Sequence, residues 1–283
     1  MNTIEVKSYA KINLCLNILK RLPNNYHEIS SLMQKINLFD EIKVCKKENS
    51  LDVKTNIDKL NSEIKYNTAY LASRYFFDYT KIKSGADIYI KKNVPHQAGL
   101  GGSSANAAAV IDALDVLYKT NLKYDEKFNL GLKVGCDVPF FFGSGTAVVE
   151  GVGDKIIQKN QLNGYYLIII KPDFGICTKT AYASINPLNL ENKCSSEALY
   201  SAYLEHNKEK IKQYTINTFE DVIDQKAQII SLKKDILDCG AITALMTGSG
   251  SAVFGLFEND YECTLSFNTL KNKHRNIFKC KFI

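Results

Sequence analysis

The chain has 283 residues, of which 45% are hydrophobic and 23% are charged, and its formal net charge is +6. These values are close to those of ordinary globular proteins and exclude a chain that is disordered throughout. The longest apolar run, residues 165–170, is far too short to cross a membrane, and the first residues lack the pattern of a signal peptide. We therefore expect a soluble, cytoplasmic protein with two domains or one large one.

The lysines are spread along the chain instead of forming a basic block, and the cysteines include no Cys-x-x-Cys pair. A modest positive charge suits an anionic small molecule, whereas nucleic-acid binding usually needs a concentrated basic patch. Scattered cysteines do not indicate a zinc ribbon, and no other metal-ligand spacing appears. We expect a small-molecule substrate, no nucleic-acid or membrane partner, and a monomer or weak homodimer.

Up to residue 94, the sequence predicts several strands and one helix. Residues 4–18 alternate between apolar and other side chains, which predicts a strand with one apolar face and with Lys11 and Asn13 on the opposite face. A turn region rich in proline and asparagine follows at 21–29, and residues 36–54 have the pattern of further strands. Helical spacing predicts a helix over 67–79, and 86–94 predicts a strand that ends before Pro95.

A glycine-rich loop follows at 99–104, and after it apolar residues recur at helical spacing up to residue 118. Residues 135–156 mix turns with short strands, and 164–172 predict a buried strand. Polar, helical sequence fills 191–238, and a second glycine loop precedes an apolar strand within 245–257. A polar stretch before residue 164 suggests two domains, 1–157 and 158–283.

The first glycine loop, Gly-Leu-Gly-Gly-Ser-Ser, lies between a predicted strand and a predicted helix. The first amides of a helix lack partners within the helix and carry partial positive charge, and glycine lets a backbone approach a ligand closely. This order is typical of a phosphate cradle, although a tight turn without a ligand explains it equally well. The spacing does not fit the dinucleotide fingerprint, the Walker pattern or the protein-kinase signature.

The stretch from Pro95 to Ser104 resembles the Pro-x-x-x-Gly-Leu-Gly-Ser/Gly-Ser-Ser motif of the galactokinase, homoserine kinase, mevalonate kinase and phosphomevalonate kinase (GHMP) superfamily. Three other segments are similar to motifs of one family within it, the 4-diphosphocytidyl-2-C-methylerythritol kinases: SYAKINLCLNI (8–18), NYHEISSLMQKINLFDEI (25–42) and GCDVPFFFGSGTAVVEGVGD (135–154). MTGSGSAVFGLF (246–257) is similar to the C-terminal glycine motif of the superfamily. Order and spacing agree over most of the chain.

The resemblance implies an α+β fold in two domains. The N-terminal one, 1–157, would be a β-α-β domain like domain 2 of ribosomal protein S5, for ATP binding and catalysis, and the C-terminal one, 158–283, would be ferredoxin-like and bind the substrate. The resemblance also implies ATP-dependent phosphorylation of the 2-hydroxyl of 4-diphosphocytidyl-2-C-methylerythritol in non-mevalonate isoprenoid synthesis. One alternative is another kinase of the superfamily, acting on homoserine or in the mevalonate pathway. The other is a non-catalytic nucleotide- or RNA-binding protein. Tyr26 and His27 argue against the first alternative, and the presence of both Lys11 and Asp137 argues against the second.

The resemblance places Lys11 and Asp137 at the acceptor hydroxyl. Phosphoryl transfer depends mainly on positioning and on charge stabilisation. Asp137 would be the base or would orient the hydroxyl, while Lys11 would keep Asp137 ionised and bind the transferring phosphoryl group. From the residues alone, Asp137 could instead cap a turn before Pro139. Lys11 could instead be a solvent-exposed lysine of a strand.

The resemblance implies that the backbone amides of the glycine loop contact the phosphates of ATP. It also implies that two further residues contact the adenosine. The residues are Pro95, Gly99, Leu100, Gly101, Gly102, Ser103 and Ser104, with Asn67 and Lys92 at the adenosine. Mg²⁺ would bridge phosphate oxygens, with Ser103 or Ser104 as a possible contact and the other metal ligands unknown. The alternatives are a helix N-cap for the serines and ordinary surface polarity for Asn67 and Lys92.

For the acceptor, aromatic faces would stack on the cytosine base and one side chain would bond to its edge. The resemblance implies that Tyr26 and Tyr182 hold the base between them and that His27 reads its edge. The other substrate-binding candidates are Asn13, Thr178, Gly248 and Ser249. The chain has 16 tyrosines, so a tyrosine at 182 could also occur there by chance. Gly248 and Ser249 also fit a simple turn that binds no ligand.

Overall fold

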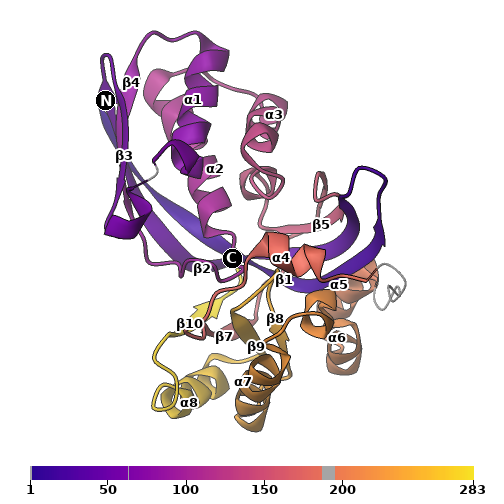
Figure 1. Ribbon diagram of the computed structural model, residues 1–283. Helices are drawn as coiled ribbons and strands as arrows, with labels where there is room; N and C mark the ends of the chain where they lie inside the picture. The colour runs from indigo at the N-terminus through magenta and orange to yellow at the C-terminus, as the bar shows by residue number, and fades with distance from the viewer. Residues whose placement is uncertain (1, 63, 187–194) are drawn as a thin grey trace. The chain divides into compact units, whose positions relative to one another are not determined.

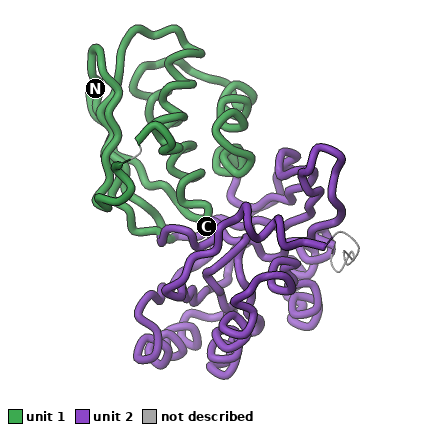
Figure 2. Tube along the Cα trace, in the orientation of Figure 1, with its two compact units in different colours: residues 1–10, 38–94, 101–143 green, residues 11–37, 95–100, 144–283 purple. Residues whose placement is uncertain are grey.

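The computed structural model describes residues 2–62, 64–186 and 195–283, which form two compact units (Figure 2). Unit 1 comprises residues 1–10, 38–94 and 101–143, and unit 2 comprises 11–37, 95–100 and 144–283. Two long strands, β1 (Thr3–Arg21) and β2 (His27–Lys47), contribute residues to both units. The division expected at residue 157, between ATP-binding and substrate-binding domains, stays a prediction.

Unit 1 is a sheet packed against helices (Figure 1). Strand β4 (Gly85–Lys91) pairs in parallel with β3 (Leu51–Thr55) and antiparallel with the second half of β2, so that Ile88 lies opposite both Val53 and Val44. Helices α1 (Thr68–Thr80) and α2 (Gly102–Tyr118) cover these strands with apolar side chains such as Phe76 and Leu114. The unit also contains α3 (Tyr124–Val134) and three short 3-10 helices, Asp58–Leu60, Ile64–Tyr66 and Pro139–Phe142.

Unit 2 contains a four-stranded antiparallel sheet in the order β10-β7-β9-β8. The strands are β7 (Tyr166–Ile170), β8 (Thr243–Met246), β9 (Val253–Phe257) and β10 (Ile277–Lys281). Helices α7 (Lys226–Asp238) and α8 (Asp260–Leu270) pack on this sheet around a core that includes Ile168 and Ile236. An alanine at Gly255 would put its Cβ 2.1 Å from Cγ2 of Ile236, so the absence of a side chain there lets α7 approach β9 closely.

The rest of unit 2 surrounds the first half of β2. Strand β5 (Thr146–Gly151) pairs with β2 between residues 29 and 34, and β6 (Lys155–Gln158) pairs with β5. The helices are α4 (Thr178–Ala183), α5 (Ser196–Leu204), α6 (Lys208–Tyr214) and the 3-10 helix η5 (Thr218–Asp221). Among the described residues, no helix combines the length and apolar character that a membrane span requires.

The strand predicted over 4–18 is confirmed, and so are the helix over 67–79 and the helix after the glycine loop. Ala10–Ile18 is buried on both faces of β1, including the face that carries Lys11 and Asn13. Strand β2 begins at His27, well before the predicted residue 36. Its first part pairs with β5, a long-range partner that local alternation does not indicate.

Candidate functional site

Lys11 is a buried lysine in β1, with only 4% of its surface exposed. Its ammonium donates a hydrogen bond of 2.5 Å to Oδ1 of Asn13, and its backbone N–H donates to the carbonyl of Leu100 at 3.0 Å. An ammonium is buried only where polar partners replace water. The interpretation of Lys11 as a solvated strand lysine is therefore wrong, and the structure places Lys11 beside the first glycine loop, within unit 2.

The two glycine loops contact each other inside unit 2. Gly99 has a φ of +73°, and an added Cβ would lie 2.0 Å from the carbonyl oxygen of Thr247. The backbone N–H of Ala252 donates to the carbonyl of Ala98 at 3.1 Å. The glycine at 99 is therefore required by protein packing, because no side chain has room where the loops meet.

Thr247 joins this contact to β1. Its hydroxyl accepts a hydrogen bond from the backbone N–H of Asn13 at 2.9 Å and lies 3.4 Å from the carbonyl of Gly99. Asn217 also binds the second loop. Its side chain is buried, at 3% exposure, and its amide donates to the carbonyls of Met246 and Gly248 at 2.6 and 2.8 Å. Asn217 was not predicted, because a polar residue before a short helix carries no local signal of a contact with residues so much later in the chain.

Ser249 of the second loop meets α4. Its hydroxyl lies 2.8 Å from that of Thr178, so two predicted acceptor-binding residues are direct neighbours. Asn13 is near the same loop, but both ends of its carboxamide already bind protein groups: Oδ1 accepts from Lys11 and Nδ2 donates to Oγ of Ser31 at 2.8 Å. The predicted role of Asn13 in substrate binding remains a prediction, and its structural role is to hold Lys11.

In unit 1, helix α2 begins immediately after Gly101, which has a φ of +66°, and no described side chain caps this end of the helix. By contrast, Asn or Ser side chains cap α1, α5, α6 and α8. Ser103 lies in the first turn, where its carbonyl accepts a hydrogen bond of 2.7 Å from the hydroxyl of Thr68. The interpretation of the serines as the N-cap is wrong, since Gly101 holds that position and leaves the first amides without a capping side chain.

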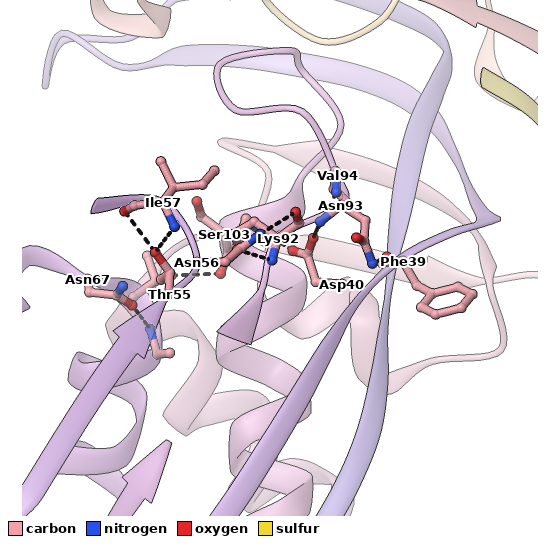
Figure 3. A network of polar contacts seen from close by, with 12 residues as sticks. Phe39, Asp40, Thr55, Asn56, Ile57, Asn67, Lys92, Asn93, Val94 and Ser103 are labelled. Carbon is pink, nitrogen blue, oxygen red and sulfur yellow. Dashed lines mark hydrogen bonds and ion pairs between the residues drawn. The ribbon is translucent and has the colours of Figure 1, made fainter. Parts of the chain in front are cut away.

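Lys92 is not an ordinary surface lysine, because its side chain is 7% exposed and its ammonium forms an ion pair with Asp40, whose side chain is fully buried (Figure 3). The other carboxylate oxygen of Asp40 accepts from the backbone N–H groups of Asn93 and Val94 at 2.7 and 2.8 Å. An added Cβ at Gly102 would lie 3.5 Å from Nζ of Lys92, so the ammonium is close to the first residue of α2. Asp40 was not predicted as a site residue, although it lies in the NLFDEI segment that carries the family resemblance.

The side chain of Asn67 caps α1 by accepting a hydrogen bond from the backbone N–H of Ala69 at 2.9 Å. At the same helix start, the hydroxyl of Thr68 donates to the carbonyl of Ser103. Asn67 therefore belongs to the part of unit 1 that supports the beginning of α2. Its predicted contact with the adenosine stays a prediction.

The predicted base-binding residues are partly brought together in unit 2. The rings of His27 and Tyr182 stack with centroids 5.2 Å apart and 24° between their planes, and the Tyr182 ring also meets Phe219 edge to face. Tyr26 is 60% exposed and leaves its ring available to a ligand. His27 is buried, and among the described residues its Nε2 has no hydrogen-bond partner.

Burial lowers the pKa of His27, and the nearby charge of Arg21 lowers it further. The imidazole is therefore neutral at pH 7, with one nitrogen as a donor and the other as an acceptor. A neutral ring with an unpartnered buried nitrogen suits a hydrogen bond to a nucleobase edge better than to an anion.

Asp137 lies in unit 1, in the turn between α3 and the 3-10 helix that begins at Pro139, and it is half-buried. Lys11 belongs to unit 2. The predicted contact between Asp137 and Lys11 therefore stays a prediction.

Comparisons with known proteins agree along the whole chain. Residues 67–145 match the GHMP kinases N terminal domain. A 4-diphosphocytidyl-2-C-methyl-D-erythritol kinase of Clostridium tetani is 34% identical over 99% of this chain and 100% of its own length. Another, of Thermosipho africanus, is 42% identical over 90% of this chain and 91% of its own.

The chain belongs to the 4-diphosphocytidyl-2-C-methyl-D-erythritol kinase family.

Solved structures confirm the fold of this family for the chain. A 4-(cytidine 5'-diphospho)-2C-methyl-D-erythritol kinase aligns over 99% of both chains with a TM-score of 0.84 and 25% identity. A homoserine kinase from Cytophaga hutchinsonii aligns over 99% of this chain and 95% of its own with a TM-score of 0.76 and 18% identity. The predicted α+β GHMP-kinase fold is confirmed, and so is the prediction of an ATP-dependent small-molecule kinase.

The buried ion pair of Lys92 and Asp40 gives a prediction for stability. Lys92→Met should destabilise the protein by about 3–5 kcal/mol, because it leaves a buried carboxylate without its cation. Adding Asp40→Asn should recover much of this loss, since no buried charge then remains. Urea denaturation measures both variants.

The neighbouring Lys91 supplies the control. Its ion pair with Glu41 is about half exposed, at 53% and 50% for the two side chains. Lys91→Met should therefore change the free energy of unfolding by less than about 1 kcal/mol. Equal losses for Lys91→Met and Lys92→Met would contradict the account of Lys92 as a buried, paired cation.

Proposed function

We propose that this protein transfers the γ-phosphoryl group of ATP to the 2-hydroxyl of 4-diphosphocytidyl-2-C-methyl-D-erythritol, a step of non-mevalonate isoprenoid synthesis. The observation that carries the proposal is the buried ammonium of Lys11, held by Asn13 where β1 bonds to Leu100 of the glycine loop. Buried charge of this kind is expensive and is commonly retained for function. Relatives that match the chain over nearly its full length carry the name of this kinase.

Asp137 takes the proton of the acceptor hydroxyl, or orients that hydroxyl, as the hydroxyl oxygen attacks the γ-phosphorus. The bond between the γ-phosphorus and the bridging oxygen breaks, and ADP leaves with the electron pair. Lys11 stabilises the charge on the transferring phosphoryl group through its ammonium. The enzyme's contribution is therefore to position the two reactants and to place a cation beside the charge of the transition state.

The phosphates of ATP bind to the backbone amides at the start of α2, in the loop that runs from Pro95 to Ser104. The uncapped N-terminus of α2 supports this, because its amides and the helix dipole favour an anion there. In this proposal Asn67 and Lys92 contact the adenosine, and the ammonium of Lys92 is close to the first residue of α2.

Mg²⁺ accompanies ATP in this proposal. Among the described residues, no group of three or more His, Cys, Asp or Glu side chains could hold a metal ion. The exposed Ser103 or the half-buried Ser104 would offer Mg²⁺ a hydroxyl ligand, and phosphate oxygens and water would supply the other ligands. When bound, Mg²⁺ neutralises phosphate charge.

The cytosine of the acceptor stacks on the exposed ring of Tyr26, and Nε2 of His27 bonds to its edge. The unpartnered, buried Nε2 supports this role, since a ligand would satisfy it. Tyr182 holds the imidazole from one side and, in this proposal, contributes its ring to the base-binding region. Thr178, Ser249 and Gly248 bind the more polar part of the acceptor.

The cytoplasmic location, the lack of nucleic-acid and membrane partners and the monomeric or weakly dimeric state also stay predictions. The cysteines in the described part of the chain are free thiols, which supports a reducing compartment.

Asp137→Asn should reduce turnover by about 10²–10⁴-fold, because an amide keeps the shape but cannot accept the proton. ATP affinity, measured by calorimetry, should stay unchanged. Asp125→Asn is the control, since Asp125 is an exposed carboxylate in the first turn of α3. Turnover of Asp137→Asn within tenfold of the wild type would remove Asp137 from the mechanism.

Tyr26→Ala should raise the KM for the cytidine substrate by about 5- to 150-fold and leave the KM for ATP unchanged, because stacking on a base contributes ~1–3 kcal/mol. Tyr261→Ala removes an exposed ring, 74%, from α8 and should change neither constant. A uridine analogue should be a poor substrate, because its base edge replaces an amine donor with a carbonyl acceptor. An unchanged KM for the cytidine substrate in Tyr26→Ala would contradict the assignment.

A further inference from the structure

We propose that Ser31 is a positioning residue for Lys11: its hydroxyl fixes the orientation of the Asn13 carboxamide, which in turn holds the Lys11 ammonium. The inference rests on the proposed function only in taking Lys11 as the cation at the transferring phosphoryl group. Ser31 lies on β2, in the part of the strand that belongs to unit 2 with β1.

A chain of hydrogen bonds links the four residues. The ammonium of Lys11 donates to Oδ1 of Asn13 at 2.5 Å, Nδ2 of Asn13 donates to Oγ of Ser31 at 2.8 Å, and the Ser31 hydroxyl donates to the carbonyl of Cys15 at 2.6 Å. Asn13, Cys15 and Ser31 are fully buried, and Lys11 is 4% exposed. Water therefore has little access to replace a lost bond.

The direction of this chain is fixed at both ends. A backbone carbonyl can only accept a hydrogen bond, so the single hydroxyl proton of Ser31 must point to Cys15. The oxygen of Ser31 can then only accept from Asn13, so the NH₂ group of Asn13 must be the donor. An ammonium can only donate, and it meets the remaining carboxamide oxygen. Every bond in the chain thus agrees with a single orientation of Asn13.

Without the Ser31 hydroxyl, the buried NH₂ group of Asn13 loses its acceptor, and the carboxamide is held only at its oxygen, by the ammonium. A carboxamide that is held at one end instead of two positions its oxygen less precisely. The hydrogen bond from Lys11 to that oxygen is then less well oriented. The effect should appear in the chemical step, where the position of the cation is critical, and not in the binding of ATP.

The test is the kinetics of Ser31→Ala, with Ser31→Thr as rescue and Ser30→Ala as matched control. Threonine retains the hydroxyl and suits a strand. Ser30 is the adjacent residue of the same strand, but its hydroxyl lies 2.8 Å from that of Ser196, away from the Lys11 chain. Thermal unfolding of each variant checks that the protein is folded.

For Ser31→Ala we expect kcat to fall about tenfold, the effect of leaving a buried hydrogen-bonding group without its partner. The KM for ATP should stay within about twofold, and Ser31→Thr and Ser30→Ala should retain kcat within about twofold of the wild type. A purely structural role of the hydroxyl would not separate kcat from KM in this way.

Unchanged kcat in Ser31→Ala, or an equal loss in Ser30→Ala, would overturn the inference. Lys11→Ala, measured in the same assay, separates this failure from a failure of the proposed function. If Lys11→Ala abolishes turnover while Ser31→Ala does not, only the positioning role is wrong. If Lys11→Ala retains turnover, Lys11 is not the cation of the reaction, and the positioning role of Ser31 is then wrong as well.

Discussion

The close backbone contact between the two glycine loops is the constraint on which the rest of unit 2 depends. Gly99 can have no side chain because the carbonyl of Thr247 occupies the space, and the hydroxyl of Thr247 in turn binds the backbone of Asn13. Three segments that are far apart in the sequence are joined in this way. Lys11 is two residues from that junction and bonds to Leu100 through its backbone, so its place beside the loop follows from main-chain contacts.

Each unit buries a lysine ammonium against polar side chains. Lys92 is paired with a carboxylate, which neutralises its charge within the protein. Lys11 donates to the carboxamide of Asn13 in the bonds described above. Because burying an ion is costly without compensation, polar contacts of this kind are needed around each ammonium. Lys92 supports the start of α2, while the proposed function assigns Lys11 to the transferring phosphoryl group.

Local sequence patterns predicted the elements that carry the site but not the contacts that organise it. Strand β1 and helices α1 and α2 have strong periodicity, and the glycine loop has a motif, so their types were predictable. Lys11 and Asn13 were placed correctly on one face of β1. That this face is also buried depends on segments much later in the chain, which alternation cannot reveal.

The same limit explains the missed residues. Asp40 and Ser31 are single polar residues in a long strand, and Asn217 precedes a short helix; each acts through partners that only folding brings near. The surface interpretation of Lys92 was wrong for a related reason. A lysine at the end of a strand is usually solvated, and only the pairing of Asp40 with residues 92–94 buries it.

The acceptor decides which reaction this protein performs, because the fold is shared with homoserine and mevalonate kinases. The test is ADP release from ATP with 4-diphosphocytidyl-2-C-methyl-D-erythritol, L-homoserine or mevalonate as the only acceptor. We expect a kcat/KM for the cytidine compound that exceeds the others by at least about a hundredfold, since only its base could satisfy the buried Nε2 of His27. Comparable or faster phosphorylation of homoserine or mevalonate would contradict this expectation.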